Sequence, residues 1–186
     1  MLALKGLNFV LQFLIREDYF REGFIMFFKV YQLRSWGNPP SPEFKVITAD
    51  GTGVFFIIAD TQKPGNYVMI NKNRQYVALI ENTVNEGMPA VKFWNGTTDL
   101  GFMDIAKRGP YTYDLNSVGL HVTTSAGQLT NGVTEFTDNE GKPVGKLFFG
   151  AAQLKKNWIL EIDKPENAIP AMLMLFIITK SHRLIT

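Results

Sequence analysis

The feature that most constrains the fold is an apolar stretch near the C-terminal end, residues 168–178. It is apolar on every side, whereas a helix on a protein surface shows one apolar stripe. Eleven residues rise only ~16 Å as a helix, and the hydrocarbon core of a bilayer is ~30 Å thick. We therefore expect a helix over residues 168–182 that is buried in the protein. The side chains expected in this core are Met172, Leu173, Leu175, Phe176 and Ile177.

Two residues are candidates for the start of this helix. Asp163 and Glu166 have the spacing of a capping box, and Asn167 is the alternative N-cap. We favour Asn167, because a start at Asp163 places Pro170 in the helix interior. A proline there has no N–H for the helical hydrogen bond.

The chain between residues 24 and 162 reads as short strands joined by polar turns. Residues 24–33 are rich in aromatic and β-branched residues, which favour strands. Asp50-Gly51 and Asn95-Gly96 are typical of hairpin turns. Strand–turn–strand units are expected over residues 43–57, 66–80, 90–103 and 133–149, and single strands over 111–115, 118–124 and 157–162.

These connections are too short for parallel crossovers, so the strands must be mostly antiparallel. An open sheet of about twelve strands tends to curl, and closing it covers its edges. The fold class we predict is mainly β: about twelve antiparallel strands closed into a barrel around the apolar C-terminal helix, which fills the interior.

Residues 1–20 form a separate apolar segment, and residues 21–186 are expected to form one domain. The segment is a helix or strand docked on the body, a membrane-surface anchor, or a cleaved signal peptide. A single cation, Lys5, and the lack of a small-x-small cleavage site disfavour the signal peptide. The residues that share one helical face are Leu4, Leu7, Leu11 and Leu14.

Composition excludes several classes of function. The 19 Lys and Arg residues against 17 Asp and Glu give a net charge of +2, and no long basic run suggests nucleic-acid binding. The chain has no Cys, which excludes a disulfide scaffold, a Cys-ligated metal and a thiol nucleophile. A reducing, cytoplasmic setting fits this composition.

Catalytic groups do not form a recognisable set. The two histidines, His121 and His182, have no nearby serine-nucleophile motif and no metal-binding spacing. The carboxylates that flank turns are ordinary solvated charges rather than acid–base pairs. We expect no catalytic residue, no metal and no cofactor, and therefore no enzymatic activity. The carboxylates weighed as acid–base pairs are Asp99 with Asp104 and Glu135 with Asp138.

Six cations lie in or near predicted turns or precede a strand. If they converge at one end of the barrel, they attract anionic lipid head groups, each contributing ~1 kcal/mol near such a surface. The alternative is an ordinary solvated rim. The six are Lys72, Arg74, Lys107, Arg108, Lys155 and Lys156.

From residue 24 to about residue 183 the chain resembles the tubby C-terminal-like superfamily, which includes phospholipid scramblases and LURP-one-related proteins. An aromatic first strand carries the resemblance, with strand–Asp-Gly–strand units such as residues 46–51 and the apolar helix 169–178. It implies a twelve-stranded barrel around a central hydrophobic helix. The basic head-group motif of tubby proteins has no counterpart here, and neither has the scramblase Cys-rich stretch. Residues 138–141 lack the ligand spacing of a calcium loop.

The resemblance implies a non-enzymatic module that binds lipid or a membrane surface. Its expected partner is an anionic phospholipid or membrane surface, and we expect it in the cytoplasm, peripheral to the membrane. The alternative is a barrel that acts as a protein-interaction scaffold, binds a protein partner and has no affinity for lipid.

Overall fold

A computed structural model describes residues 25–32, 42–105, 111–150 and 157–183 of the chain. Each strand predicted from the sequence is present, and each predicted turn joins the strands expected on either side of it. The strands are β1 Met26–Gln32, β2 Pro42–Thr48, β3 Val54–Ala59, β4 Tyr67–Asn71, β5 Tyr76–Asn85, β6 Met88–Asn95, β7 Thr98–Asp104, β8 Tyr111–Leu115, β9 Leu120–Thr124, β10 Val133–Thr137, β11 Pro143–Gly150 and β12 Asn157–Ile162.

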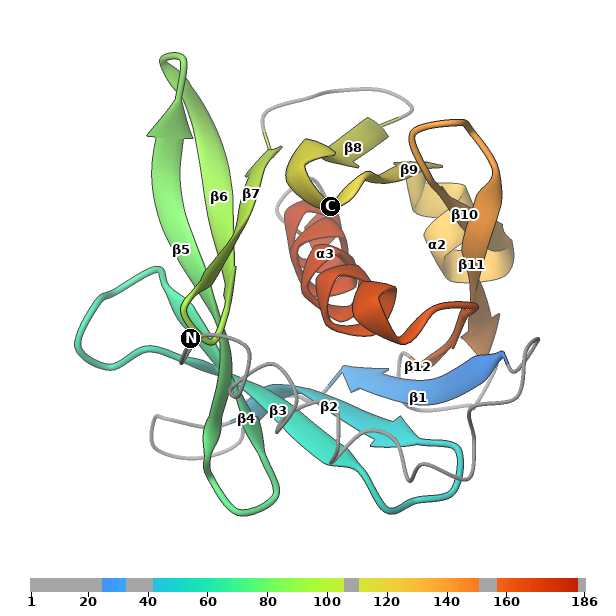
Figure 1. Cartoon of the computed structure of the whole chain (residues 1–186), viewed down its shortest axis with the longest axis horizontal. Coiled ribbons are helices and arrows are strands. Elements are labelled where there is room, and N and C mark those ends of the chain that lie inside the picture. The colour runs from blue at the N-terminus through green and yellow to red at the C-terminus, as the bar shows by residue number, and fades with distance from the viewer. Residues whose placement is uncertain (1–24, 33–41, 106–110, 151–156, 184–186) are drawn as a thin grey trace, which may run out of the picture.

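The twelve strands form one antiparallel sheet with the order β7-β6-β5-β4-β3-β2-β1-β12-β11-β10-β9-β8. Among the described strands, all neighbours in the sheet are consecutive in the chain except β1 and β12. These are the first and the last strand in the sequence, and they pair with each other. The sheet curls into a nearly closed barrel whose edges are β7 and β8 (Figure 1). The hydroxyl of Ser117, next to β8, donates a hydrogen bond to the carbonyl of Leu100 on β7. The fold class predicted from the sequence is confirmed.

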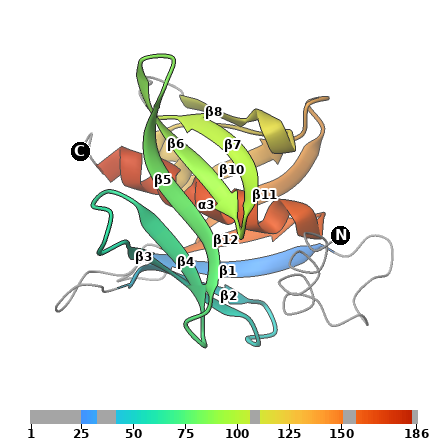
Figure 2. The same ribbon diagram turned by 60° about the vertical axis from the view of Figure 1, so that its left-hand side comes forward.

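The helix α3 spans Pro165–Arg183 and lies within the curve of the sheet (Figures 1 and 2). Its residues from 168 to 179 are all buried, on every face of the helix. The Phe176 ring packs edge-on against Phe44 of β2, with centroids 5.1 Å apart, and against Tyr67 of β4, at 4.8 Å. The five side chains named for the core helix, 172, 173, 175, 176 and 177, are no more than 5% exposed.

The predicted helix start at Asn167 is wrong, because α3 begins earlier, at Pro165. Proline is well suited to a first helical position, where no N–H bond is needed. The N–H of Asn167 donates to the carbonyl of Lys164 at 3.1 Å and closes the first turn. Pro170 lies inside the helix, and the carbonyl left without a helical partner belongs to Glu166, which is an exposed residue.

Two short helices were not predicted. They are the 3₁₀ turn η2 over Asn116–Val118 and the helix α2 over Ala126–Asn131. Ser125 caps α2 by accepting a hydrogen bond from the N–H of Gln128. The indole N–H of Trp158 on β12 donates to the carbonyl of Leu129 in α2 at 3.0 Å. A single turn between strands has too little apolar periodicity for recognition from sequence.

The predicted N-terminal segment, residues 1–20, lies outside the described residues, so its three alternatives stay open. Among the helices of the described ranges, none is both long enough and apolar enough to cross a membrane.

Candidate functional site

Two of the six predicted cations, Lys72 and Arg74, lie in the turn between β4 and β5, and both are exposed. Asn71 holds this turn. Its side-chain oxygen accepts from the backbone N–H groups of Asn73 (2.9 Å) and Gln75 (3.0 Å). Arg74 adopts a positive φ of 61°, and its N–H donates to the Asn71 carbonyl. The backbone that carries the two cations is therefore fixed by local hydrogen bonds.

A second turn, between β2 and β3, lies at the same end of the barrel, because Phe55 near the start of β3 pairs with Asn71 at the end of β4. Asp50 organises this turn. The Thr48 hydroxyl donates to Asp50 Oδ1 at 2.5 Å, and the Thr52 N–H does so at 3.0 Å. These hydrogen bonds lower the pKa of Asp50, that from Thr48 most strongly. Both oxygens of the Asp50 carboxylate therefore accept hydrogen bonds within the β2–β3 turn.

A hollow of about 150 Å³ lies between the two turns. Tyr76, a residue that is 47% exposed, is part of its lining. Its lining carries one ammonium and the side-chain amides of Asn73 and Gln75, which can donate hydrogen bonds. The Thr52 hydroxyl donates to Asp50 at 2.8 Å, and the Asn71 amide donates to Gln75 Oε1 at 2.8 Å. This set of donors suits a small anionic oxygen group such as a phosphate. The polar lining residues are Thr52, Asn71, Lys72, Asn73 and Gln75.

The outer surface of the barrel next to this hollow is apolar, which the sequence analysis did not anticipate. The inward residues Phe55 and Ile57 of β3 and Met69 of β4 are buried. The outward residues Phe56, Ile58, Val68 and Ile70 are apolar too and half-buried, as is Leu79 on β5, while Tyr76 on β5 is exposed. Together with Lys45, these side chains form what we call the β2–β5 outer face: Lys45, Phe56, Ile58, Val68, Ile70, Tyr76 and Leu79.

Cross-strand pairing arranges this face in rows. Phe56 pairs with Ile70, and Ile70 pairs with Tyr76 at the edge of the hollow. At the other end of the row the ammonium of Lys45 lies 6.0 Å from the centre of the Phe56 ring. A signal for this face was present in the sequence. Residues 54–59 and 67–70 are near-continuous apolar runs, and strands covered on both faces have such runs.

The other four predicted cations lie in segments outside the described residues. These segments are 106–110, which contains Lys107 and Arg108, and 151–156, which contains Lys155 and Lys156. The convergence of all six cations at one end of the barrel therefore stays a prediction. The structure brings Lys72 and Arg74 into one turn beside the hollow.

A polar hollow of about 290 Å³ lies at the seam between the edge strands β7 and β8. Asp114 lines it, and one carboxylate oxygen of Asp114 lies 2.8 Å from Nδ1 of His121. The other ring nitrogen, Nε2, lies 2.8 Å from the amide oxygen of Asn139. Hydrogen bonds to Asn139 and then to Asp114 raise the pKa of His121. Because both ring nitrogens are engaged, His121 ties β8, β9 and the β10–β11 turn together.

The carboxylates considered as acid–base pairs have structural partners. Asp99 lies 2.7 Å from the ammonium of Lys92, which lowers the pKa of Asp99. Glu135 lies 3.3 Å from the ammonium of Lys146. Asp138 accepts hydrogen bonds from the backbone of its own turn. Among the described residues, no group of three His, Asp or Glu side chains is placed to hold a metal ion.

Comparison of the chain with protein-family models, with curated proteins and with solved structures gives no match. The tubby-like resemblance therefore stays a resemblance, and its functional implications enter below as a proposal.

Proposed function

We propose that this chain is a non-enzymatic module that binds the surface of anionic membranes, in the manner implied by its resemblance to tubby- and scramblase-like barrels. The observation that carries the proposal is the position of Lys72 and Arg74 at the edge of an apolar outer face. Lys72 and Tyr76 both line the hollow, and Arg74 is exposed in the same β4–β5 turn.

Peripheral attachment generally needs two signals, one electrostatic and one apolar. Two cations near an anionic surface contribute about 1 kcal/mol each. Aromatic side chains such as Tyr76 favour the interface between lipid head groups and acyl chains, because one end of the ring is polar. The outer residues Phe56 and Ile70 extend this apolar contact away from the hollow. The described surface thus supplies both signals in one place.

Within this proposal, the polar residues around the hollow have separate roles in binding a head group. Lys72, which lines the hollow, attracts the phosphate of a head group, and the side-chain amides of Asn73 and Gln75 donate hydrogen bonds to its oxygens. Arg74, exposed in the same turn, adds a second positive charge near the bilayer surface. Asp50 stays ionised, because the hydrogen bonds from Thr48 and Thr52 lower its pKa, but it is not among the residues that line the hollow.

The test is co-sedimentation of the full chain with vesicles of phosphatidylcholine alone and of phosphatidylcholine mixed with phosphatidylserine. We expect recovery on the anionic vesicles that falls with added salt, because exposed charges are screened beyond ~8 Å at physiological ionic strength. Double reversal, Lys72→Glu with Arg74→Glu, is expected to abolish it. The matched control is Lys142→Glu, in the exposed β10–β11 turn on a different part of the sheet.

A second readout separates the apolar contribution. Phe56→Gln should reduce recovery at high salt while leaving the salt dependence at low salt in place, since the two cations remain. Equal recovery on both kinds of vesicle, or none on either, would overturn the proposal. In that case the apolar outer face would favour the alternative function, a scaffold that binds a protein partner through the same surface.

A further inference from the structure

A second apolar patch lies on the outer surface of β12 and β1, and we propose that it binds a second copy of this chain in a symmetric dimer. Three apolar side chains on this part of the sheet are unusually exposed: Phe27 (43%), Ile159 (39%) and Val133 (46%). They come from three strands, β1, β12 and β10. Contiguous exposed apolar groups on a sheet face typically mark an interaction site.

The register of the strands fixes how this patch is arranged. On β12 and β1, Glu161 pairs with Phe27, and Ile159 pairs with Lys29. All four side chains point outward, because their neighbours Phe28 and Leu160 are buried in the barrel. We call these four residues the β12–β1 quartet. Its apolar members occupy one diagonal and its charged members occupy the other.

This arrangement is self-complementary. A two-fold axis that lies along the Phe27–Ile159 diagonal, between two facing sheets, brings each of these two residues opposite its own copy. The same rotation brings Lys29 of one copy opposite Glu161 of the other, and does so twice in the dimer. An isologous interface requires this kind of pairing, in which residue i contacts residue j and residue j contacts residue i.

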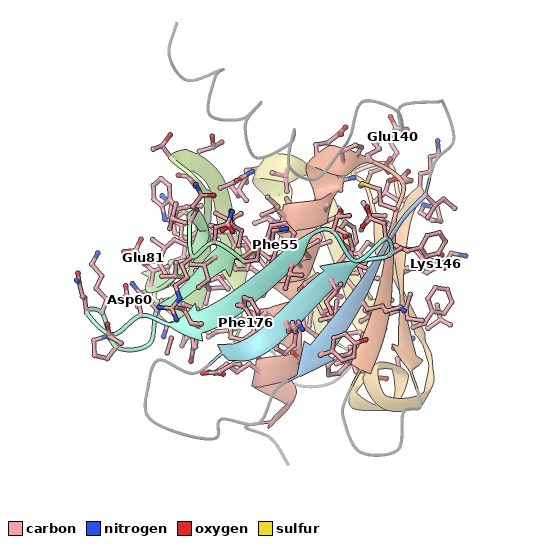
Figure 3. The ribbon with its side chains drawn as sticks, turned by 90° about the horizontal axis from the view of Figure 1, so that it is seen from below. Phe55, Asp60, Glu81, Glu140, Lys146 and Phe176 are labelled. Atoms are coloured by element: carbon pink, nitrogen blue, oxygen red, sulfur yellow. The ribbon has the colours of Figure 1, made fainter. Side chains whose placement is uncertain are left out.

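The two charged side chains of the quartet are not paired with other residues of the described ranges. Within the described ranges, neither Lys29 nor Glu161 forms an ion pair. Next to the quartet, Lys146 and Glu135 pair with each other at 3.3 Å, and Figure 3 shows Lys146 at the outer margin of the barrel.

The surroundings of the quartet also favour a second copy over a membrane. The outward charges of β10, β11, β12 and β1 are Glu135, Lys146, Glu161 and Lys29, whose sum is zero. A neutral face that contains carboxylates is not attracted to an anionic membrane. The same face matches its own charge pattern, with apolar groups at the centre of the contact. This surface shares no residue with the β2–β5 outer face, which begins on the neighbouring strand β2.

The test is the association state of the full chain, measured by sedimentation velocity across a concentration series. We expect a dimer for the native chain. Reversal of either charge, Lys29→Glu or Glu161→Lys, should weaken dimerisation by at least about tenfold, because it replaces two attractive contacts with two repulsive ones. The charge-swapped double variant, Lys29→Glu with Glu161→Lys, should regain the dimer.

A mixture of the two single variants gives the sharpest outcome. In a heterodimer of Lys29→Glu with Glu161→Lys, the two substituted positions face each other with opposite charges. The two unchanged residues, Lys29 of one chain and Glu161 of the other, also face each other, so both contacts are attractive. We therefore expect an equimolar mixture to dimerise at least about tenfold more tightly than either variant alone. Ile159→Ser should weaken every dimer, and Lys142→Glu should weaken none.

The proposal is overturned if the native chain stays monomeric at every concentration, if Lys29→Glu dimerises as well as the native chain, or if the mixture stays monomeric. Thermal melts verify that each variant is folded. If the half-buried Glu161→Lys variant is not folded, the comparison of Lys29→Glu with Lys29→Arg decides, since only the latter keeps the charge. Vesicle binding does not enter this test, so its outcome is independent of the proposed function.

Discussion

The ammonium of Lys180, near the end of α3, lies 2.9 Å from a carboxylate oxygen of Glu43 on β2, although 137 residues separate them. The same ammonium donates to the hydroxyl of Tyr67 on β4 and lies 4.0 Å from the centre of its ring. Both members of the ion pair are about three-quarters buried. This contact joins the end of the central helix to the wall of the barrel.

We expect Glu43→Gln to lower the free energy of unfolding by about 1 kcal/mol, because it leaves the largely buried ammonium without its counter-charge. Urea unfolding measures this loss. The control is Glu140→Gln in the exposed β10–β11 turn, which should have no effect. If Glu43→Gln and the control unfold at the same urea concentration, the ion pair contributes nothing to stability.

Leu175 lies in the middle of α3 and is completely buried. Leu175→Asp places an unpaired charge in the core. We expect the free energy of unfolding to fall by more than about 4 kcal/mol, which is enough to leave most molecules unfolded. Leu175→Met keeps the volume and should cost less than about 1.5 kcal/mol. Circular dichroism and thermal melts compare the two. A Leu175→Asp variant with native thermal stability would contradict the buried helix.

His121 should make stability depend on pH. Its folded-state pKa is raised above the ordinary value of 6.5, so protonation favours the folded state. The resulting stability is fully present below the unfolded-state pKa and is lost as the pH rises through the folded-state pKa. We expect His121→Gln to destabilise the protein at acidic pH and to have a smaller effect at alkaline pH.

Proton NMR measures the His121 pKa directly, and His182→Gln assigns the resonance because the chain has only two histidines. Asp114→Asn should bring the measured pKa down towards 6.5, since it removes the carboxylate that lies 2.8 Å from Nδ1. A native His121 pKa at or below 6.5 would contradict the arrangement of hydrogen bonds.

Gly101 on β7 should resist substitution more strongly than Gly51 in the β2–β3 turn. Both have a positive φ, +89° and +74°, which an L side chain adopts only at a cost of about 1 kcal/mol. A Cβ at Gly101 would also meet the Ser117 hydroxyl, whereas a Cβ at Gly51 meets nothing within 4 Å. We expect Gly101→Ala to lower the unfolding free energy by at least about 1 kcal/mol more than Gly51→Ala does. Equal losses in urea unfolding would show that the seam between β7 and β8 is loose.

Local features of the sequence were enough to predict the strands and the helix. Asp50-Gly51 and Asn95-Gly96 mark hairpins because glycine accepts the positive φ that these turns require, +74° at Gly51 and +59° at Gly96. The all-round apolar character of residues 168–178 indicated a buried helix, because no surface helix needs such a sequence. A turn or a helix core is encoded by neighbouring residues, so sequence reasoning can find it.

Only the tertiary structure decided which surfaces are joined and which are left free. The pairing of β1 with β12 brings Phe27 beside Glu161, and no local signal in either strand specifies the other. Because α3 begins at Pro165, Pro170 lies inside the helix and leaves one helical hydrogen bond unmade. Packing of the enclosed apolar residues of α3 outweighs this loss. In the same way, Phe56, Ile70 and Tyr76 become one outer row only when β3, β4 and β5 align. Hydrophobicity along the chain determines which residues leave water, but long-range strand pairing determines which of them share a face.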